Sequence, residues 1–494
     1  MAQERQEVGS VEYERAGEEY LRERELRRVA GPVLLWGLGV GYVISGEFFG
    51  WQFGLNAGGW GGLLVATAIM ATLYVTMIYS IAEMSTMMPV AGGPYAFARR
   101  AFGPWGGYFT GLAVTIEYVL APAVIAVGIG GYVAGFFADP PGWVAALVPV
   151  VAYVIFVGIN LLGARESLLV LFVITGISVV VLVVWGLAML PSFSVDNLLD
   201  IAPQEGGSRF LPYGFFGIVA ALPAAGWFYL AIEGVPLAAE ETADPPRDLP
   251  RGMILAMLSL VAFSLISLFM GPGAAGAEAL ATSDNPLPAA AEAVAGRGAV
   301  YWLVTSVGLT GLIASFFSII FAYSRQIYAL SRAGYLPPWL SKVNRRRAPH
   351  RALIVGAILG YVVILIVDAF NAGDIATGDL LIQMAVFAAL ISYIMMMLSH
   401  IKLRRDFAAL ERPYRTPGYP VTPVVALVLS VVALFSSLFY TDAALFAVIG
   451  TALAYLVGLA YFWFHSRHHL VADAPEEEFA LIEAAEAELA EGQG

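Results

Sequence analysis

The sequence predicts an all-α integral membrane protein that crosses the bilayer twelve times. The chain of 494 residues is 59% hydrophobic, and only 13% of its residues are charged, whereas soluble chains carry about 25%. Apolar stretches of about 20 residues, the length that spans ~30 Å of hydrocarbon, recur along the whole chain. Each span must be a helix, because lipid offers no hydrogen-bond partner to an open backbone.

The apolar stretches are separated by polar or charged connections. We place the twelve spans near residues 31–56, 60–88, 105–137, 143–161, 166–190, 212–241, 250–271, 299–330, 351–369, 376–401, 420–439 and 442–465. Together they define a membrane domain of residues 30–466. The charged segment 1–29 lacks the short apolar core of a signal peptide and is predicted to be a cytoplasmic amphipathic helix. The acidic, helix-favouring tail 467–494 is predicted to be solvated and dispensable for function.

Basic residues indicate the orientation of the chain. Loops that face the cytoplasm carry an excess of Lys and Arg, and the basic loops here are those after even-numbered spans. Of the 26 basic residues, only Arg209 and Arg297 fall in predicted outer loops. We therefore expect a multi-pass protein of the cell (inner) membrane with both termini in the cytoplasm.

Several function classes have little support. The chain has no cysteine, which excludes disulfides and thiolate metal sites. Its five histidines do not form a metal-binding spacing, and no nucleophile–base pair or phosphate-binding loop is visible. We expect neither an enzyme nor a nucleic-acid-binding protein, and no metal or organic cofactor.

Two predicted spans, five helices apart, are interrupted in the same way. Span 1 contains GVGYVISGEFFGWQFG, and span 6 contains WFYLAIEGVPLAAEE. Each has a glycine beside an acidic residue in mid-span, at Ser45–Glu47 and at Ile232–Gly234, and Pro236 follows the second. Glycine and proline also occur in membrane helices simply to allow close packing. Matching breaks in two halves, however, are the pattern of a transporter site, where half-helix ends and unwound backbone meet a solute.

Three carboxylates lie within the spans, at Glu47, Glu117 and Glu233. A charged Asp or Glu at the centre of a span costs ~2.5–3.5 kcal/mol, and no Lys or Arg lies in the central part of any predicted span. These groups are therefore protonated or paired with something outside the chain, such as a substrate ammonium group, a proton or Na⁺. The pattern predicts a transporter for a small organic cation, with H⁺ or Na⁺ as a possible coupling ion.

Aromatic residues crowd the same two segments. Aromatic faces attract ammonium groups by ~2 kcal/mol or more when water is excluded, although aromatic residues in membrane helices often serve packing or interfacial anchoring. Next to breaks and unpaired carboxylates, Phe48 and Trp227 are predicted to face the ammonium group of a substrate.

At these residues the chain resembles a known family. GEFFGWQFG, GGPYAFARRAFGPWGGY, EGVPLAAEETADPPRDLPRG and SRQIYALSRAGYLPPWL are similar to motifs of the amino acid–polyamine–organocation (APC) superfamily, over about residues 21–465. YLRERELRR, VISGEFFGWQFGLNAGG and IEYVLAPAVIAVGIGGY resemble the bacterial ethanolamine permeases within it. The resemblance implies two inverted five-helix repeats plus two peripheral helices. It also implies a substrate held between the breaks of spans 1 and 6, beside spans 3, 8 and 10.

The resemblance also implies roles for individual residues. Ser45 and Gly46 would offer backbone groups at the first break, and Trp227 matches the aromatic residue that closes over the substrate from outside. Glu233 occupies the acidic position of span 6 that is implicated in gating and proton coupling. One departure is Glu47, where the ethanolamine group carries the shorter Asp, so a different small amine fits as well.

Na⁺-coupled relatives use hydroxyl groups of span 8, a role that Ser315 and Ser318 match, although serines in membrane helices often bond to their own backbone. The coupling ion stays open. The predicted site residues are Ser45, Gly46, Glu47, Phe48, Glu117, Trp227, Ile232, Glu233 and Gly234 for substrate binding, and Glu233, Ser315 and Ser318 for coupling or gating.

The sequence thus predicts a secondary active transporter that imports a small amine, with ethanolamine as the first candidate, by alternating access. Its partners would be the amine and the lipid bilayer, and a monomer suffices. One alternative is a general amino acid permease of the same superfamily, whose half-helix N-termini would bind the substrate carboxylate. A channel or sensor is the other, although neither tail is large enough for a signalling domain and no pore-loop filter is visible.

Overall fold

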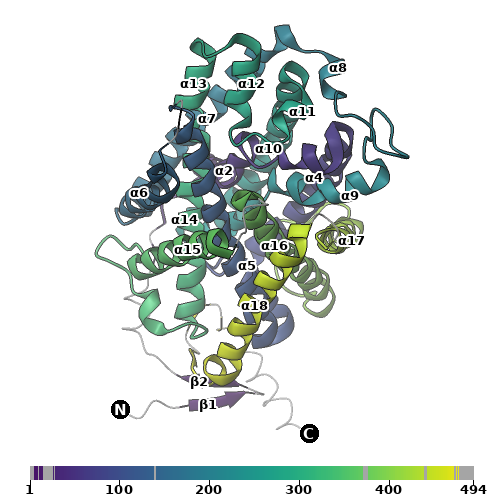
Figure 1. The fold of residues 1–494 in the computed structure, drawn as a ribbon. Helices are drawn as coiled ribbons and strands as arrows, with labels where there is room; N and C mark the ends of the chain where they lie inside the picture. Colours follow the sequence, from purple (N-terminus) through teal and green to yellow (C-terminus); the bar gives the residue numbers. More distant parts are fainter. Residues whose placement is uncertain are drawn as a thin grey trace.

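The computed structural model describes residues 5–8, 11–14, 26, 28–137, 139, 141–370, 376–438, 442–471, 474–475 and 477. Within these ranges the chain forms a helical bundle (Figure 1) with ten helices long and apolar enough to cross a membrane. Two shorter apolar helices, Pro32–Phe48 and Val421–Ser436, fall at the predicted spans 1 and 11. The multi-pass helical architecture agrees with the sequence analysis, while the count of twelve spans and the inverted repeats stay predictions.

The helices and strands follow one another in a fixed order along the chain. They are β1 (Arg5–Val8), β2 (Val11–Glu14), α2 (Pro32–Val43), α3 (Ser45–Phe48), α4 (Phe53–Met87), α5 (Pro94–Ala134), α6 (Trp143–Asn160), α7 (Ala164–Met189), η1 (Leu190–Ser192), α8 (Val195–Leu198), α9 (Gly214–Trp227), η2 (Ile232–Glu241), α10 (Pro245–Ala275), α11 (Ala277–Leu280), α12 (Pro286–Ala295), α13 (Ala299–Val307), α14 (Leu309–Arg332), η3 (Pro338–Ser341), α15 (His350–Phe370), α16 (Thr377–Asp406), α17 (Val421–Ser436), α18 (Asp442–Phe464), η4 (Ser466–His468) and β3 (Leu470–Val471).

Glycine kinks change the direction of two long helices. Helix α4 contains both the end of the first predicted span and the whole of the second, with a sharp change of direction at Gly59, whose φ is 68°. Helix α5 changes direction in the same way at Gly103, whose φ is 75°. A positive φ of this kind is readily adopted only by glycine. At each position one glycine bends the chain, and the helix resumes directly after it.

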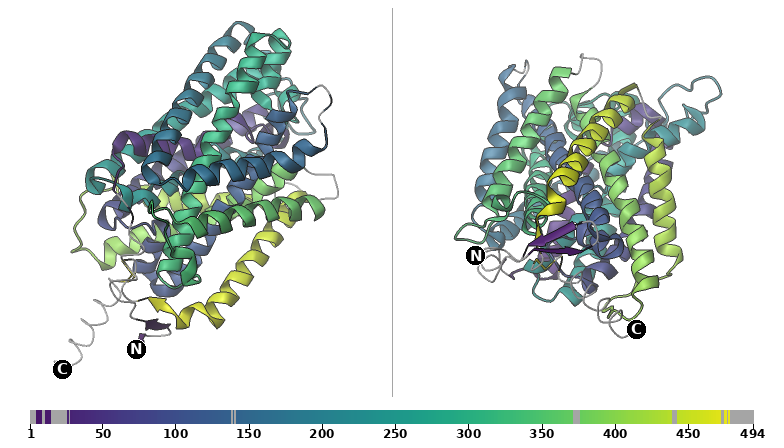
Figure 2. Two further views of the ribbon diagram at one scale, coloured as in Figure 1. Left: turned by 90° about the vertical axis from the view of Figure 1, so that its left-hand side faces the viewer. Right: turned by 90° about the horizontal axis from the view of Figure 1, so that it is seen from below.

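The interior of the bundle is built around α5 and α4. Helix α5 packs along α16 and α14, while α4 packs along α9 and α10. Large exposed apolar side chains are frequent on the outward faces of α6, α7, α15, α17 and α18, which run along the periphery of the bundle (Figures 1 and 2). A surface of this kind is stable in lipid rather than in water.

A small sheet lies at one end of the bundle, away from α12 and α13 (Figure 1). Strand β2 pairs antiparallel with β1 and parallel with β3, so Tyr13 lies opposite Leu470. The prediction of an amphipathic helix over residues 1–29 is therefore wrong for 5–8 and 11–14. The alternation of Val11 and Tyr13 with glutamates has the period of two that favours a strand.

The described part of the C-terminal tail is attached to the bundle. Glu477 is fully buried and lies 2.6 Å from the guanidinium group of Arg99, and the Tyr335 hydroxyl donates to its other oxygen at 3.1 Å. The prediction of a solvated tail is thus wrong at Glu477. The contact was missed because nothing in the sequence indicates that this carboxylate pairs with a buried arginine. Residues 478–494 lie outside the described ranges.

Buried ion pairs join α14 to η2. Arg325 and Glu241 are 3.0 Å apart with side chains that are 1% and 0% exposed, and the Arg325 guanidinium lies 3.4 Å from the centre of the Phe321 ring. Two turns further along α14, Arg332 binds Glu240 at 2.5 Å. These contacts fix the end of η2 against α14.

We expect the substitution Glu241→Gln to lower the stability of the protein substantially. Removing one partner of a buried ion pair leaves an uncompensated charge, here on Arg325, at a cost of about 3–5 kcal/mol. The control Glu292→Gln breaks an exposed pair with Arg297, with side chains 45% and 44% exposed, and exposed pairs are worth at most about 1 kcal/mol. Thermal unfolding of the detergent-purified variants checks the prediction, and equal melting temperatures for the two would contradict it.

Candidate functional site: the two helix breaks

The first break lies between α3 and α4. The backbone N–H of Ser45 donates to the hydroxyl of Ser315 on α14 at 2.7 Å instead of to its own helix. The chain then makes one helical turn, Ser45–Phe48, and opens at Phe49, which has extended φ and ψ angles of −158° and 145°. Gly50 follows with a φ of 102°, which a residue with a side chain rarely adopts. The helix therefore opens one turn later than the predicted Ser45–Glu47.

The second break follows α9. The helix ends at Trp227, and the chain passes through Ala231, which has a left-handed φ of 77°. It then continues as the 3₁₀-helix η2, so the predicted break at Ile232–Gly234 falls in the first turn after the opening. Pro236 cannot donate a backbone hydrogen bond and crowds the preceding turn, which explains why an α-helix does not resume here.

The two breaks lie against each other. A Cβ atom on Gly46 would lie 2.6 Å from the carbonyl oxygen of Trp227, so the two backbones approach more closely than any side chain allows. The indole N–H of Trp227 donates to the carbonyl oxygen of Phe49 at 2.8 Å. Trp51 stacks on Phe228 with ring centres 6.2 Å apart. The structure thus brings together the two segments that the sequence singles out.

A pair of carboxyl groups lies beside the second break, surrounded by tyrosines. Glu233 accepts hydrogen bonds from Tyr118 at 2.8 Å and from Tyr393 at 2.9 Å, one on each oxygen. Glu117 on α5 is a close neighbour of Glu233 and Tyr393, and its own oxygens accept no hydrogen bond from a described N–H or O–H group. The Tyr74 hydroxyl donates to that of Tyr393 at 3.3 Å. Two adjacent carboxyl groups of this kind are stable when they share one proton.

Glu47 has a separate environment. It is fully buried, and neither of its carboxyl oxygens has a hydrogen-bond partner among the described residues. The hydroxyl of Ser267 on α10 donates to its backbone oxygen at 3.0 Å. Glu47 and Glu117 are both predicted substrate-binding residues, and they have different neighbours: Glu117 lies beside Glu233, whereas Glu47 contacts Ser267 of α10.

Several other carboxylates in the interior have arginine partners, in contrast to these three. Glu83 binds Arg404 through both oxygens at 2.7 and 2.6 Å, and Arg412 lies 3.1 Å from it. Glu240 and Glu241 are paired as described above. Among the ion pairs of the described ranges, none involves Glu47, Glu117 or Glu233.

A small cavity lies beside the two breaks and is lined by residues from both segments. It has a volume of about 10 Å³, roughly the room that one water molecule requires. Its lining consists of Tyr42, Val43, Ser45, Ala121, Trp227, Leu230 and Ile319. Ser45 and Trp227 are two of the lining residues, whereas the ring of Phe48 packs against Gly311 of α14. The position of Phe48 gives no support to its predicted contact with an ammonium group.

Ser318, Gly234 and Ile232, which were also predicted as site residues, contact other parts of the protein. The hydroxyl of Ser318 donates to the carbonyl oxygens of Ala314 and Ser315 in its own helix, at 2.8 and 3.0 Å. A Cβ atom on Gly234 would lie 2.8 Å from the Tyr118 hydroxyl, and the side chain of Ile232 packs near Gly39. Gly234 therefore leaves room for the tyrosine that holds Glu233.

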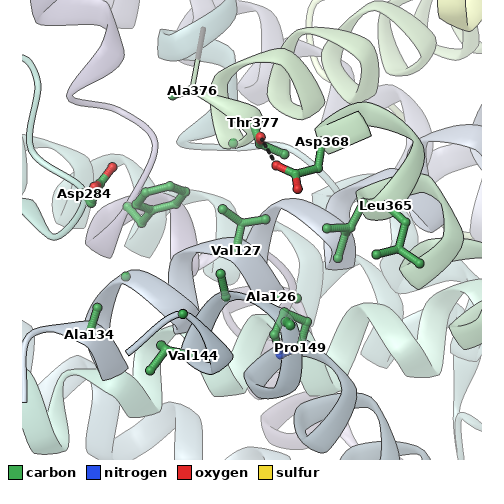
Figure 3. A pocket seen from close by; sticks show the side chains of 18 of the residues that line it. Ala126, Val127, Ala134, Val144, Pro149, Asp284, Leu365, Asp368, Ala376 and Thr377 are labelled. Atoms are coloured by element: carbon green, nitrogen blue, oxygen red, sulfur yellow. Dashed lines mark hydrogen bonds between the residues drawn. The ribbon is translucent and has the colours of Figure 1, made fainter. Parts of the chain in front are cut away.

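A second and much larger cavity opens toward the predicted outer side. It has a volume of about 610 Å³ and is lined by α5, α6, α15 and the start of α16, with Phe49 and Phe53 from the first break (Figure 3). Two carboxylates, Asp284 and Asp368, border it, and Thr377 donates to Asp368 at 3.4 Å. This cavity is wide enough to admit a small solute.

Sequence reasoning did not identify several residues of the site. Tyr393 donates to Glu233, Tyr42 lines the small cavity with a buried hydroxyl that has no described partner, and Ser267 contacts Glu47. Only Tyr118 carried a signal, because it follows Glu117 directly. Tyr393 and Ser267 lie on other helices, and no spacing in the sequence connects them with the breaks. Tyr42 lies three residues before Ser45 in the segment of the first break, but nothing in its local sequence distinguishes it from a packing residue.

Comparison with known proteins adds to this geometry. Residues 34–474 match the model of a family described as amino acid permease. A transporter of Rhizobium meliloti named as uncharacterized is 30% identical, over 90% of this chain and 93% of its own length. The branched-chain amino acid permease BcaP of Bacillus subtilis is 26% identical over 90% of this chain and 95% of its own. A methylthioribose transporter of the same organism is 25% identical over 91% and 96%.

Proposed function

Because this chain belongs to the amino acid permease family, a family of transporters, we propose that it is a secondary transporter that imports a small amine by alternating access. Ethanolamine is the first candidate for the substrate. The observation that carries the proposal is the set of three buried carboxyl groups, Glu47, Glu117 and Glu233, for which the described residues offer no basic partner. A solute with an ammonium group and no carboxylate supplies the missing charge.

Glu47 is proposed as the group that binds the ammonium. Both of its carboxyl oxygens are buried and without a described donor, and it lies two residues before Phe49, where the helix opens. A buried acceptor without a partner costs about 1–3 kcal/mol, and more when it is charged. A bound ammonium group removes that cost, since it donates up to three hydrogen bonds.

The pair Glu117–Glu233 is proposed as the site of proton coupling. Two tyrosine hydroxyl groups already occupy the oxygens of Glu233, so the pair has less need of a substrate than Glu47 has. Na⁺ coupling through span 8 receives less support, because the Ser315 hydroxyl accepts the backbone N–H of Ser45 and Ser318 bonds to its own helix. We therefore favour H⁺ over Na⁺ as the coupling ion.

The placement in the cell also belongs to the proposal. We propose insertion in the inner membrane with both termini in the cytoplasm, on the distribution of Lys and Arg given above. The two sites lie within one chain, so a monomer in the bilayer suffices for transport.

A general amino acid permease is the second candidate. The lining of the small cavity is mostly apolar, which suits an apolar side chain, and BcaP carries branched-chain amino acids in its name. Backbone groups of the two breaks would then bind the substrate carboxylate. The two candidates differ in whether the bound solute carries a carboxylate.

The test is the thermal unfolding of detergent-purified protein with ethanolamine, choline, methylamine, alanine, leucine and arginine. A ligand at 100 times its Kd stabilises the folded state by ~2.7 kcal/mol, which produces a measurable shift. We expect a shift with ethanolamine or another small amine and none with the amino acids. A shift with alanine or leucine alone would replace the proposal by the amino acid permease.

A further inference from the structure

We infer that the ring of Phe49 is the barrier between the outer cavity and the small cavity at the breaks, so that its displacement opens the substrate path. The inference rests on the proposed transport function and names one side chain that controls access to the site. It begins from one face of α5. Ala121 on this face lines the small cavity, and Gly128, seven residues or about two turns further along the same face, contacts the ring of Phe49, a residue that lines the outer cavity.

Phe49 occupies the space between these cavities. Its ring lines the outer cavity, yet the residue is only 3% exposed, so the ring is enclosed on its other sides. Its carbonyl oxygen accepts the indole N–H of Trp227, and Trp227 lines the small cavity. A solute that moves from one cavity to the other therefore meets the contact between Phe49 and Trp227.

Two glycines make the seat of this ring. A Cβ atom on Gly128 of α5 would lie 2.9 Å from the Phe49 ring, and one on Gly378 of α16 would lie 3.2 Å from it. The ring also contacts Phe53 edge-on, with centres 5.7 Å apart. Side chains at positions 128 and 378 would occupy the volume of the ring, so the closed position of Phe49 depends on their absence.

The backbone at this position allows the ring to move. Phe49 is the extended residue of the break, and Gly50 after it has a φ of 102°. Neither residue is held in a continuous helix, so a rotation of the Phe49 side chain does not require a helix to unwind. The indole N–H of Trp227 donates its hydrogen bond to the backbone oxygen of Phe49 and not to the side chain. Rotation of the ring therefore does not break this hydrogen bond.

The experiment uses introduced thiols, because the chain contains no cysteine. Ala121→Cys places one thiol in the small cavity, and Ala134→Cys places one in the outer cavity. Each is treated in intact cells with a membrane-impermeant methanethiosulfonate and no substrate. We expect Ala134→Cys to react readily and Ala121→Cys to be protected.

Opening the barrier is then tested with Phe49→Ala and Gly128→Ala, each combined with Ala121→Cys. We expect the labelling rate to rise at least about tenfold, as when an open state goes from about 1% to 10% of the population. Gly128→Ala keeps Phe49 and provides the test if Phe49→Ala does not fold. The matched control is Gly130→Ala on the same helix, where a Cβ atom would meet nothing within 4 Å.

The inference is overturned if Ala121→Cys stays protected in both variants while Ala134→Cys reacts. It is also overturned if Gly130→Ala raises the labelling rate of Ala121→Cys as much as Gly128→Ala does. A third contrary result is that Ala121→Cys reacts as fast as Ala134→Cys when Phe49 is unchanged. The readout contains no substrate. A wrong assignment of the substrate class therefore leaves this result unchanged.

Discussion

Replacing Glu47 by glutamine is expected to abolish ethanolamine binding and to leave the protein folded and inserted. Glutamine has the same shape but carries no charge, and the carboxyl group of Glu47 has no described partner that would be lost. Truncating one member of a buried charge pair costs about 2–5 kcal/mol of binding free energy, which weakens binding at least about 30-fold. Binding is measured by the ethanolamine-dependent shift in melting temperature.

The control for this variant removes a carboxylate of the predicted outer loops. Glu278→Gln changes an exposed side chain on α11 and alters the net charge of the protein by the same amount. Ethanolamine binding should be retained there, because water and salt largely screen the charge of a solvent-exposed carboxylate. Equal losses in both variants, or normal binding by Glu47→Gln, would refute the role of Glu47.

Replacing Glu233 by glutamine is expected to uncouple transport from the proton gradient. Glutamine still offers an oxygen to one tyrosine, and its amide faces a hydroxyl group that can accept, so the contacts with Tyr118 and Tyr393 persist in part. It cannot gain or lose a proton. A gradient of one pH unit supplies ~1.4 kcal/mol per proton, enough for about tenfold accumulation. In proteoliposomes the variant should accumulate no substrate above the equilibrium level.

Counterflow separates uncoupling from inactivation. Exchange of labelled for unlabelled substrate needs no gradient, so it should continue in Glu233→Gln. The control Tyr393→Phe removes one hydrogen bond to Glu233 and keeps the carboxyl group, so accumulation should persist with a changed pH profile. A Glu233→Gln transporter with the accumulation and pH dependence of the wild-type protein would show that another group carries the proton.

Much of the fold follows from composition and periodicity, and the exceptions have local physical causes. Long apolar stretches identify the helices because lipid imposes one solution on the backbone. The kinks at Gly59 and Gly103 were not predicted, because a glycine inside an apolar run does not reveal whether its φ is positive. The strands of the N-terminal segment form a local hairpin, and the alternation at Val11–Glu14 was a sign of it; the pairing of β2 with β3, more than 450 residues away, is contained in no local pattern.

The site residues that could be predicted are those that are unusual within a single membrane span. Glu47, Glu117 and Glu233 stand out because charge within lipid is costly, and the breaks stand out through glycine and proline. The division of the three acids into a pair and a single group was not predictable, since it depends on how α5, α10 and η2 pack. Tyr393 was missed for the same reason, because tyrosine is ordinary in a membrane helix until it lies opposite a carboxyl group.

The close approach at Gly46 has a consequence for how the molecule moves. No side chain lies between the backbone of Gly46 and the carbonyl oxygen of Trp227. The two backbones are therefore in direct contact, which hinders one break from sliding past the other. We expect the two breaks to behave as a single rigid unit during the transport cycle, while the surrounding helices move relative to them. The binding site would then keep its geometry throughout the cycle, and the parts that change shape would be the barriers on either side of it.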